Sequence, residues 1–241
     1  MGHMIPRIIH CCWFGGAKTA LAEKCLASWR KFAPGWEVRE YDIAGLRGLA
    51  GLRGLAGGRG RMPGSVEDFL ARRVWAFPAD WLRIKALHEH GGVYFDFDFE
   101  LLAPIDDLLE KGQFVAGQWN PAGDVIPEPA VLALEPRSPI AAAMLDYYDA
   151  HGLDGRTTVG EIMSQVVAGT AMERTLTVLP PEVFSPIDPA GRLRRTAATR
   201  GIHHYTMSWT PWWRRLLRWF CWHGGRRLVD VALRVKHAVR R

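Results

Sequence analysis

The chain contains 241 residues, of which 48% are apolar and 23% are charged, and its formal net charge at neutral pH is +6. This composition excludes a disordered chain, and the length suffices for a hydrophobic core without disulfide bonds. The charge is uneven, because residues 211–241 hold nine Lys or Arg and one Asp, whereas the other 210 residues hold 22 basic and 24 acidic side chains. We therefore predict a near-neutral globular domain over residues 4–210, a basic helical tail over residues 211–241 and no nucleic-acid partner.

The first predicted elements are a strand, a helix and a strand. Residues 5–16 form an apolar run that ends in two glycines, and residues 22–32 carry apolar side chains at helical spacing before Pro34 ends the pattern. Residues 36–41 alternate between apolar and polar side chains, which predicts a second strand. This order predicts an α/β fold with parallel pairing. The lack of an export signal and the four scattered cysteines predict reduced thiols in a cytoplasmic protein.

Glycine and arginine dominate the next segment, in which Gly-Leu-Arg-Gly-Leu-Ala occurs twice within residues 45–56. Two copies are too few for a solenoid, so we expect a surface loop over residues 45–64. A phosphate-binding loop is the alternative. The segment contains neither Gly-x-Gly-x-x-Gly after a strand nor the Lys-Ser/Thr pair of a Walker motif, so the loop without a ligand is favoured.

Residues 65–90 predict two helices that are separated at Pro78, and Gly91-Gly92 end the second helix. Residues 93–99 then alternate strictly, with apolar side chains on one face and one Tyr and two Asp on the other, which predicts a strand. Downstream we expect proline-containing loops within residues 101–149, a helix over residues 141–150 and a short strand over residues 175–179.

Asp96 and Asp98 are the strongest chemical signal. Two carboxylates two residues apart on a strand point to the same side, and their burial is costly unless a cation or hydrogen bonds satisfy them. Oxygen ligands of this kind suit Mg²⁺ or Mn²⁺, which keep coordination positions open for phosphates. The preceding glycine pair and the surrounding aromatic residues favour this metal site over the alternative, a solvated acidic face on an edge strand.

Two further groups could complete such a site. Asp80 and Arg83 lie three residues apart on the preceding helix, and the planar fork of an Arg suits a diphosphate. An imidazole of His203 or His204 can complete the shell of a metal, and Trp209 can donate its indole N–H to a phosphate. The alternatives are a surface ion pair for the first group and a buried strand end with a packed Trp for the second.

Four segments, in this order, resemble glycosyltransferase family 32, whose members carry an Asp-x-Asp motif. They are Ile5 to Gly15, Ala79 to Asp98, Phe184-Ser185-Pro186, and His203-His204 followed by Ser208-Trp209. The resemblance implies a GT-A fold with a mixed, mostly parallel central sheet. It also implies transfer of a sugar, with retention at the anomeric carbon, from a nucleotide-diphosphate sugar to a glycan or lipid-linked glycan. The implied cofactors are Mn²⁺ or Mg²⁺ and a UDP-sugar donor, with a GDP-sugar as the alternative.

The resemblance also implies roles for single residues. Trp13 either fills the core or stacks on the nucleotide base, and the resemblance favours the base. Asp80 would bond ribose or sugar hydroxyls, and Arg83 would contact the sugar or the diphosphate. The implied catalytic residues are Asp80, Arg83, Asp96, Asp98 and Trp209; the donor site adds Trp13, Phe14, Tyr94 and Ser208; the metal site comprises Asp96, Asp98, His203, His204 and Ser208.

Two other functions compete with this interpretation. A phosphatase of the haloacid-dehalogenase type would use Asp96 as its nucleophile, but there the motif usually opens the chain and precedes Thr or Gly, whereas Phe99 follows it here. A non-catalytic membrane-surface adaptor built on a transferase fold is the second alternative. The intact acidic pair and the neighbouring Asp80 and Arg83 argue against an adaptor.

The basic tail predicts where the protein acts. Within residues 211–241, Trp and other apolar residues recur on one side of two helical stretches, and arginines recur on the other side. This composition is typical of an interfacial helix, and anionic lipid would attract each basic residue by about 1 kcal/mol. We therefore expect peripheral attachment to the inner face of the membrane, where a lipid-linked acceptor would lie. The alternative is a helix docked on the body with a solvated basic face.

Overall fold

The computed structural model describes residues 4–51, 61–120, 123–187 and 192–206. The main strands are β1 (Ile8–Cys12), β2 (Glu37–Tyr41), β3 (Gly92–Phe95), β5 (Phe114–Trp119), β6 (Val125–Leu134) and β7 (Thr177–Val178). They form one six-stranded sheet in the order β2–β1–β3–β6–β5–β7. β1 is parallel to β2 and β3, and β5 is parallel to β7, while β6 is antiparallel to β3 and β5. The predicted mixed, mostly parallel sheet is thus confirmed.

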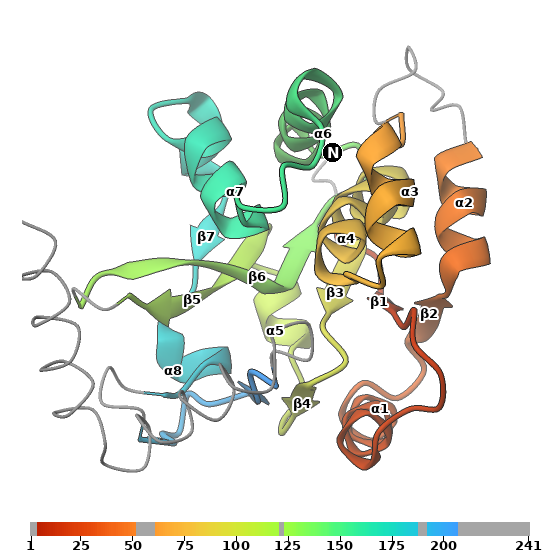
Figure 1. Cartoon of the computed structure of the whole chain (residues 1–241). Helices are drawn as coiled ribbons and strands as arrows, with labels where there is room; N and C mark the ends of the chain where they lie inside the picture. Colours follow the sequence, from red (N-terminus) through yellow and green to blue (C-terminus); the bar gives the residue numbers. More distant parts are fainter. Residues whose placement is uncertain (1–3, 52–60, 121–122, 188–191, 207–241) are drawn as a thin grey trace, which may run out of the picture.

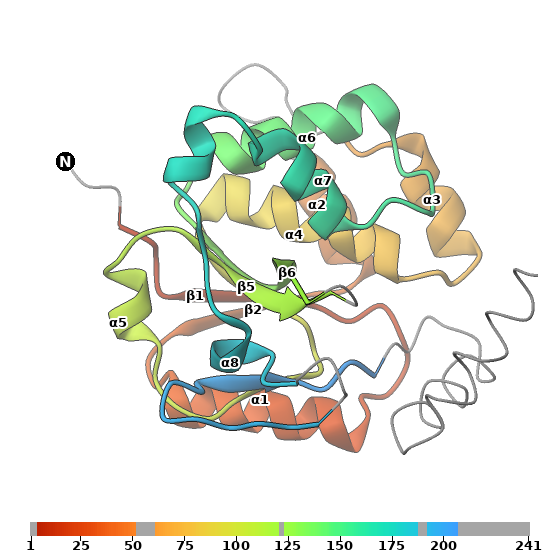
Figure 2. The same cartoon turned by 90° about the vertical axis from the view of Figure 1, so that its left-hand side faces the viewer.

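Both faces of the sheet are covered, which makes a three-layer α/β fold (Figures 1 and 2). One face carries α2 (Ile43–Gly51), α3 (Gly64–Ala71), α4 (Ala76–His90), α6 (Pro139–His151) and α7 (Val159–Val167). The other face carries α1 (Ala20–Phe32), α8 (Pro181–Phe184) and a second, two-stranded sheet of β4 (Phe99–Leu101) and β8 (Gly201–His203). Short helices over Asp106–Leu109 (α5) and Ala171–Arg174 complete the chain. Among the described residues, no helix combines the length and apolar character needed to cross a membrane.

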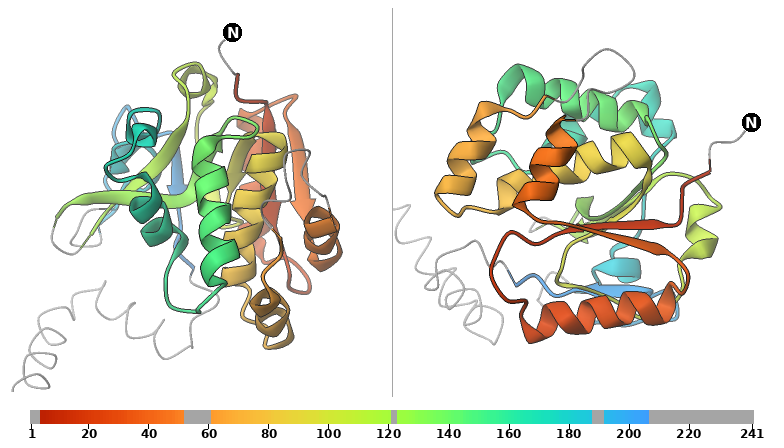
Figure 3. Two further views of the ribbon diagram at one scale, coloured as in Figure 1. Left: turned by 90° about the horizontal axis from the view of Figure 1, so that it is seen from above. Right: turned by 90° about the vertical axis from the view of Figure 1, so that its right-hand side faces the viewer.

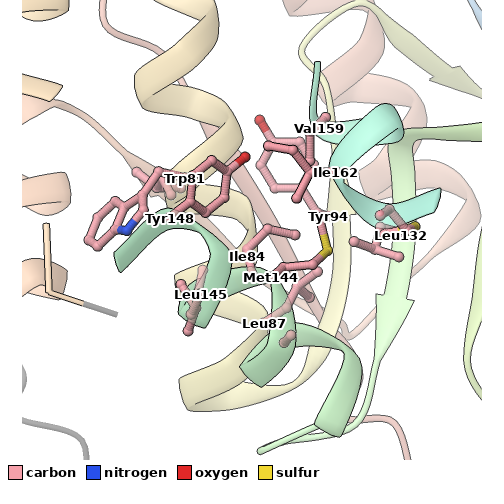
Figure 4. Packing of buried hydrophobic residues seen from close by; sticks show 14 of the residues in the cluster. Trp81, Ile84, Leu87, Tyr94, Leu132, Met144, Leu145, Tyr148, Val159 and Ile162 are labelled. Carbon is pink, nitrogen blue, oxygen red and sulfur yellow. The ribbon is translucent and has the colours of Figure 1, made fainter. Parts of the chain in front are cut away.

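The helix α4 lies at the centre of the larger core. Figure 3 shows it beside α6, and Figure 4 shows Trp81 and Ile84 of α4 packing with Met144 and Tyr148 of α6. Every residue from Trp81 to Leu87 is buried, so α4 has no solvated face over this stretch. Charged side chains in such a helix need partners. Lys85 contacts Glu89 at 2.7 Å, and Arg83 points toward the site described below.

The first copy of the glycine-rich repeat is helical, which corrects the predicted loop. α2 spans Ile43–Gly51, and its Leu46 and Leu49 are buried against the core that contains α4. The two leucines are three residues apart and therefore lie on one helical face. Their burial outweighs the low helix propensity of the glycines in α2. Residues 52–60 lie outside the described part of the chain.

Two proline-based predictions are also wrong. α4 begins at Ala76, so Pro78 does not separate two helices but occupies the first turn, where its missing N–H has no intrahelical partner to lose. The expected loops within residues 101–149 contain β5 and β6, although Pro127 and Pro129 lie in β6. The ladder between β5 and β6 shifts register after Val115, and Pro129 falls within that bulge, so it needs no ladder hydrogen bond.

The glycine pair after α4 is required by backbone geometry. Gly92 has a φ of 109°, and a Cβ atom placed there would lie 2.5 Å from the carbonyl oxygen of Ile8 on β1. We expect Gly92→Ala to lower the free energy of unfolding by about 2–4 kcal/mol, because it adds backbone strain and a contact with a neighbouring strand. Urea denaturation measures this loss. Gly48→Ala is the control, since a Cβ at Gly48 in α2 meets no atom within 4 Å; equal losses in both variants would contradict the explanation.

Candidate active site

The Asp-x-Asp motif lies in a turn, not within a strand. Phe95 ends β3 in the main sheet, and Phe99 begins β4 in the second sheet, so the chain must cross between layers over residues 96–98. The turn is closed by a hydrogen bond of 2.9 Å from the Phe99 N–H to the Asp96 carbonyl. On the outer side, Trp29 of α1 donates its indole N–H to the Phe99 carbonyl at 2.8 Å. The predicted continuous strand over residues 93–99 is therefore wrong, although the two carboxylates do converge.

The pairing of β4 with β8 brings His203 to this turn. Phe99 and His203 are direct partners in the two-stranded sheet. The His203 Nε2 lies 3.2 Å from Asp98 Oδ1 and 4.0 Å from Asp96 Oδ2. One ligand atom from each of the three residues lies within 4.8 Å of the others. Two carboxylates and an imidazole thus form a cluster that suits a divalent cation, and we call it the acidic cluster.

Asp98 is the most firmly held member of the acidic cluster. Its Oδ2 accepts hydrogen bonds of 2.8 Å from both the N–H and the hydroxyl of Thr206. Burial would raise the pKa of Asp98, but the charge of His203 and the hydrogen bonds from His203 and Thr206 lower it below the usual range. For Asp96, by contrast, burial raises the pKa despite the opposing attraction of Arg83. The two carboxyl groups of the motif therefore differ in acidity.

Arg83 and Asp80 form a buried pair beside the acidic cluster. The Arg83 Nη2 lies 2.8 Å from Asp80 and 3.3 Å from Asp96, and Nη1 donates to the Pro129 carbonyl at 2.8 Å. The guanidinium also lies over the Tyr94 ring, 4.5 Å from its centroid. The exposed fractions of the Arg83 and Asp80 side chains are only 6% and 13%, which excludes a solvated surface ion pair. Burial raises the pKa of Asp80 to about 7, although the Arg83 charge opposes this.

Two of the residues predicted to contact the donor, Tyr94 and Phe14, are buried in the core. Tyr94 is 1% exposed and its hydroxyl lies 3.2 Å from Cys12 Sγ, so it supports Arg83 from beneath rather than offering surface to a donor. Phe14 is buried and packs against Trp75. Trp13 is half-buried, and its indole N–H donates to the Gly16 carbonyl at 2.7 Å. Base stacking by Trp13 stays a prediction.

The second histidine does not join the acidic cluster. The His204 Nε2 lies 2.9 Å from Glu100, which also binds Lys24. Adjacent residues on β8 and its extension point in opposite directions, which explains why only His203 faces the carboxylates. The prediction that His204 helps to ligate a metal is therefore corrected: of the two histidines, only His203 lies with the carboxylates. The predicted Ser208 and Trp209 lie outside the described residues.

A family model now adds to this geometry. Residues 65–115 match the glycosyltransferase sugar-binding region containing the DXD motif. This range holds both Asp80–Arg83 and the Asp96–Asp98 pair. The chain therefore contains the DXD sugar-binding region of a glycosyltransferase. The match favours a glycosyltransferase over a phosphatase that uses Asp96 as its nucleophile.

Comparison with solved structures finds glycosyltransferases that resemble this chain. The PaToxG glycosyltransferase superposes with a TM-score of 0.50 at 19% identity, over 68% of this chain and 69% of that one. Mouse xyloside xylosyltransferase 1 in its apo form has a TM-score of 0.49 at 12% identity, over 84% and 99% of the two chains. The UDP-bound glycosyltransferase domain of the YGT toxin has a TM-score of 0.40 at 12% identity, over 72% and 70%. No curated protein matches the sequence.

Two residues of the glycosyltransferase site escaped the sequence analysis. Thr206 anchors Asp98, and only its position three residues after His203 could have suggested it. Glu128 lies on β6, next to the carbonyl of Pro129 that binds Arg83. Its two flanking prolines resemble a loop sequence, which concealed the strand. The bulge in β6, a feature frequent beside active sites, could not be read from the sequence.

The pH dependence of stability tests the state of His203 in the metal-free transferase. Burial would lower its pKa, but the charge of Asp98 and the hydrogen bond to it raise the pKa to about 9, from 6.5. The charged imidazole thus stabilises the fold fully below pH 6.5, and this contribution is lost as pH rises through 9. We expect the free energy of unfolding in EDTA to fall by about 2 kcal/mol more in the wild type than in His203→Gln between pH 6.5 and 9.5. Urea titrations across this range measure the difference, and parallel pH profiles would contradict it.

Proposed function

We propose that this glycosyltransferase is metal-dependent and transfers a sugar from a nucleotide-diphosphate donor with retention at the anomeric carbon. The acidic cluster carries the proposal, because it combines two carboxylates and an imidazole of appropriate spacing in a partly buried turn. Mn²⁺ or Mg²⁺ fits these donors by chemistry, since both ions prefer hard oxygen ligands and Mn²⁺ accepts imidazole. Asp96, Asp98 and His203 would hold the ion.

The charge balance of the site supports a cation. The carboxylates of Asp80, Asp96, Asp98 and Glu128 interact electrostatically with two basic side chains, Arg83 and His203. Acidic groups therefore exceed basic groups among the described residues of the site. A bound divalent ion would offset this excess and would neutralise charge on the departing diphosphate.

The protein groups around the cluster would bind the rest of the donor. Arg83 is held rigidly by Asp80, Asp96 and the Pro129 carbonyl, so it places a fixed positive charge at the edge of the acidic cluster. Such preorganised charge stabilises a leaving diphosphate without reorganisation. Asp80 would accept hydrogen bonds from ribose or sugar hydroxyls, and Trp13 would stack on the base. A UDP-sugar is the first donor to test, with a GDP-sugar as the alternative.

Calorimetry and product analysis test this function. Wild-type protein should bind UDP or GDP with Mn²⁺ at least tenfold more tightly than with EDTA, and a panel of UDP- and GDP-sugars should identify the donor by its hydrolysis. NMR of the first product formed should show the anomeric configuration of the donor. Metal-independent nucleotide binding would overturn the role of the acidic cluster, and an inverted product would overturn retention.

We also propose that the basic end of the chain binds anionic membranes, where a lipid-linked glycan would be the acceptor. The composition of residues 211–241 supports this proposal, since Trp with other apolar residues and Arg recur at the spacing of an interfacial helix with one apolar and one basic side. Replacing Arg214, Arg215 and Arg218 by Gln in the full chain should lower co-sedimentation with phosphatidylserine vesicles at least tenfold, because each removed charge costs about 1 kcal/mol of attraction. Equal pelleting of both proteins would remove the membrane proposal.

A further inference from the structure

Glu128 occupies a distinctive place in the bulge of β6. It pairs with Ala116 of β5, whereas the next paired residue of β6 is Leu132, opposite Val115. The intervening backbone turns toward the site: the Pro129 carbonyl accepts from Arg83 at 2.8 Å, and the Ala130 carbonyl accepts from the Asp96 N–H at 3.0 Å. The two residues after Glu128 are thus fastened to both parts of the active site.

The register of the sheet sets Glu128 level with the Asp-x-Asp turn. β6 runs antiparallel to β3, and Val131 pairs with Phe95, the last residue of β3. Residues that precede Val131 on β6 therefore lie beyond the carboxyl end of β3, where the turn containing Asp96 and Asp98 begins. Electrostatic coupling agrees with this position, since Glu128 interacts with His203, Asp96 and Arg83.

The carboxylate of Glu128 lacks the cation that the other site carboxylates have. Asp80 and Asp96 contact Arg83, and Asp98 contacts His203. Among the described residues, Glu128 accepts a single hydrogen bond, of 3.3 Å from the Ala130 N–H, and no Lys, Arg or His lies within ion-pair distance of it. It is nevertheless half-buried, and burial raises its pKa. A charge in this position costs stability, so structure alone gives no reason for it.

The chemistry of a donor molecule decides what Glu128 could bind. Its oxygens lie outside the group of ligand atoms that Asp96, Asp98 and His203 contribute. A carboxylate repels a diphosphate. Trp13, the candidate for the base, follows β1, on the opposite side of β3 from β6. The uncharged sugar, whose hydroxyls are hydrogen-bond donors, is the part of the donor that suits a free carboxylate beside β6.

We propose that Glu128 accepts hydrogen bonds from hydroxyl groups of the transferred sugar and thereby selects the donor sugar. This inference rests on the proposed function, because it assumes that a nucleotide-diphosphate sugar binds at the acidic cluster. The donor then lies across three adjacent strands, with the base at the end of β1, the diphosphate at the end of β3 and the sugar at β6.

Paired affinities for the nucleotide with and without its sugar test the proposal. With Mn²⁺ present, Glu128→Gln should bind UDP within twofold of the wild type, whereas KM and Kd for the UDP-sugar that is turned over fastest should rise at least tenfold. A deoxy analogue of that sugar, lacking the bonded hydroxyl, should bind the wild type and Glu128→Gln with similar affinity. Glu110→Gln is the matched control, since Glu110 is exposed on the connection after α5, and it should change neither value.

The outcomes distinguish failure of the sugar contact from failure of the proposed function on which it rests. Unchanged sugar-nucleotide affinity in Glu128→Gln, or equal weakening of UDP and UDP-sugar, overturns the sugar contact. Failure of the wild type to bind UDP or GDP with Mn²⁺ overturns the proposed function itself. The thermal midpoint of metal-free Glu128→Gln should equal or exceed that of the wild type, because an unpaired charge is removed. If Glu128→Gln does not fold, Glu128→Asp, which retracts the carboxylate but keeps its charge, must show the same selective loss of sugar-nucleotide affinity.

Discussion

Asp98→Asn is expected to lower kcat/KM by about a thousandfold or more while leaving the protein folded. The substitution removes the negative charge nearest His203, which lies 3.2 Å away, and so removes the more acidic of the two carboxylates from the acidic cluster. The amide oxygen of Asn can still accept the two hydrogen bonds from Thr206, which preserves the local backbone. Loss of activity without loss of fold is therefore the distinguishing result.

Calorimetry with Mn²⁺ and UDP, followed by donor-hydrolysis kinetics, measures this effect. Asp68→Asn provides the control, because Asp68 is exposed on α3. The control should retain wild-type metal binding and turnover. Full activity of Asp98→Asn would refute the assignment of the Asp-x-Asp turn as the metal centre.

Arg83→Met is expected to produce the largest loss of stability, about 3–5 kcal/mol, because removing one partner from a buried ion pair leaves the other uncompensated. Two carboxylates, Asp80 and Asp96, would lose their nearest cation, and the Pro129 carbonyl would lose its donor. A domain of this size is typically stable by only about 5–15 kcal/mol, so the variant should unfold at a markedly lower urea concentration.

Arg47→Met is the matched control for Arg83→Met. Arg47 binds Glu67 through two hydrogen bonds of 2.8 and 2.9 Å, but its side chain is 57% exposed. Exposed ion pairs contribute about 0–1 kcal/mol, so the control should lose little stability. Adding Asp80→Asn to Arg83→Met should recover part of the loss, because it removes one of the stranded charges. Equal destabilisation by the two arginine substitutions would show that burial is not the cause.

Local sequence patterns predicted a large part of this molecule. The strand–helix–strand start follows from apolar periodicity over residues 5–41, and the structure contains β1, α1 and β2 there. The spacing of three between Asp80 and Arg83 on one helix predicted that both side chains point the same way, and they form an ion pair of 2.8 Å. Such interactions depend on neighbours within one or two helical turns, which the sequence displays directly.

The predictions that failed depended on long-range packing. α2 forms because its leucines reach a core built by α4, and Pro129 of β6 is tolerated because a bulge interrupts the ladder there. The choice between His203 and His204 follows from the register of β8 against β4, some hundred residues earlier in the chain. A shift of that register by one residue would exchange the two imidazoles.

The sequence by itself determined the chemical type of the site, since Asp96 and Asp98 lie close to each other in almost any conformation of so short a segment. Only the tertiary structure decided which groups surround them. Strand pairing selected His203, the segment after β8 supplied Thr206, and the bulge of β6 brought the Pro129 carbonyl, next to Glu128, to Arg83. The physical reason is that sheet register and bulges couple residues distant in sequence, and no local pattern of side chains records that coupling.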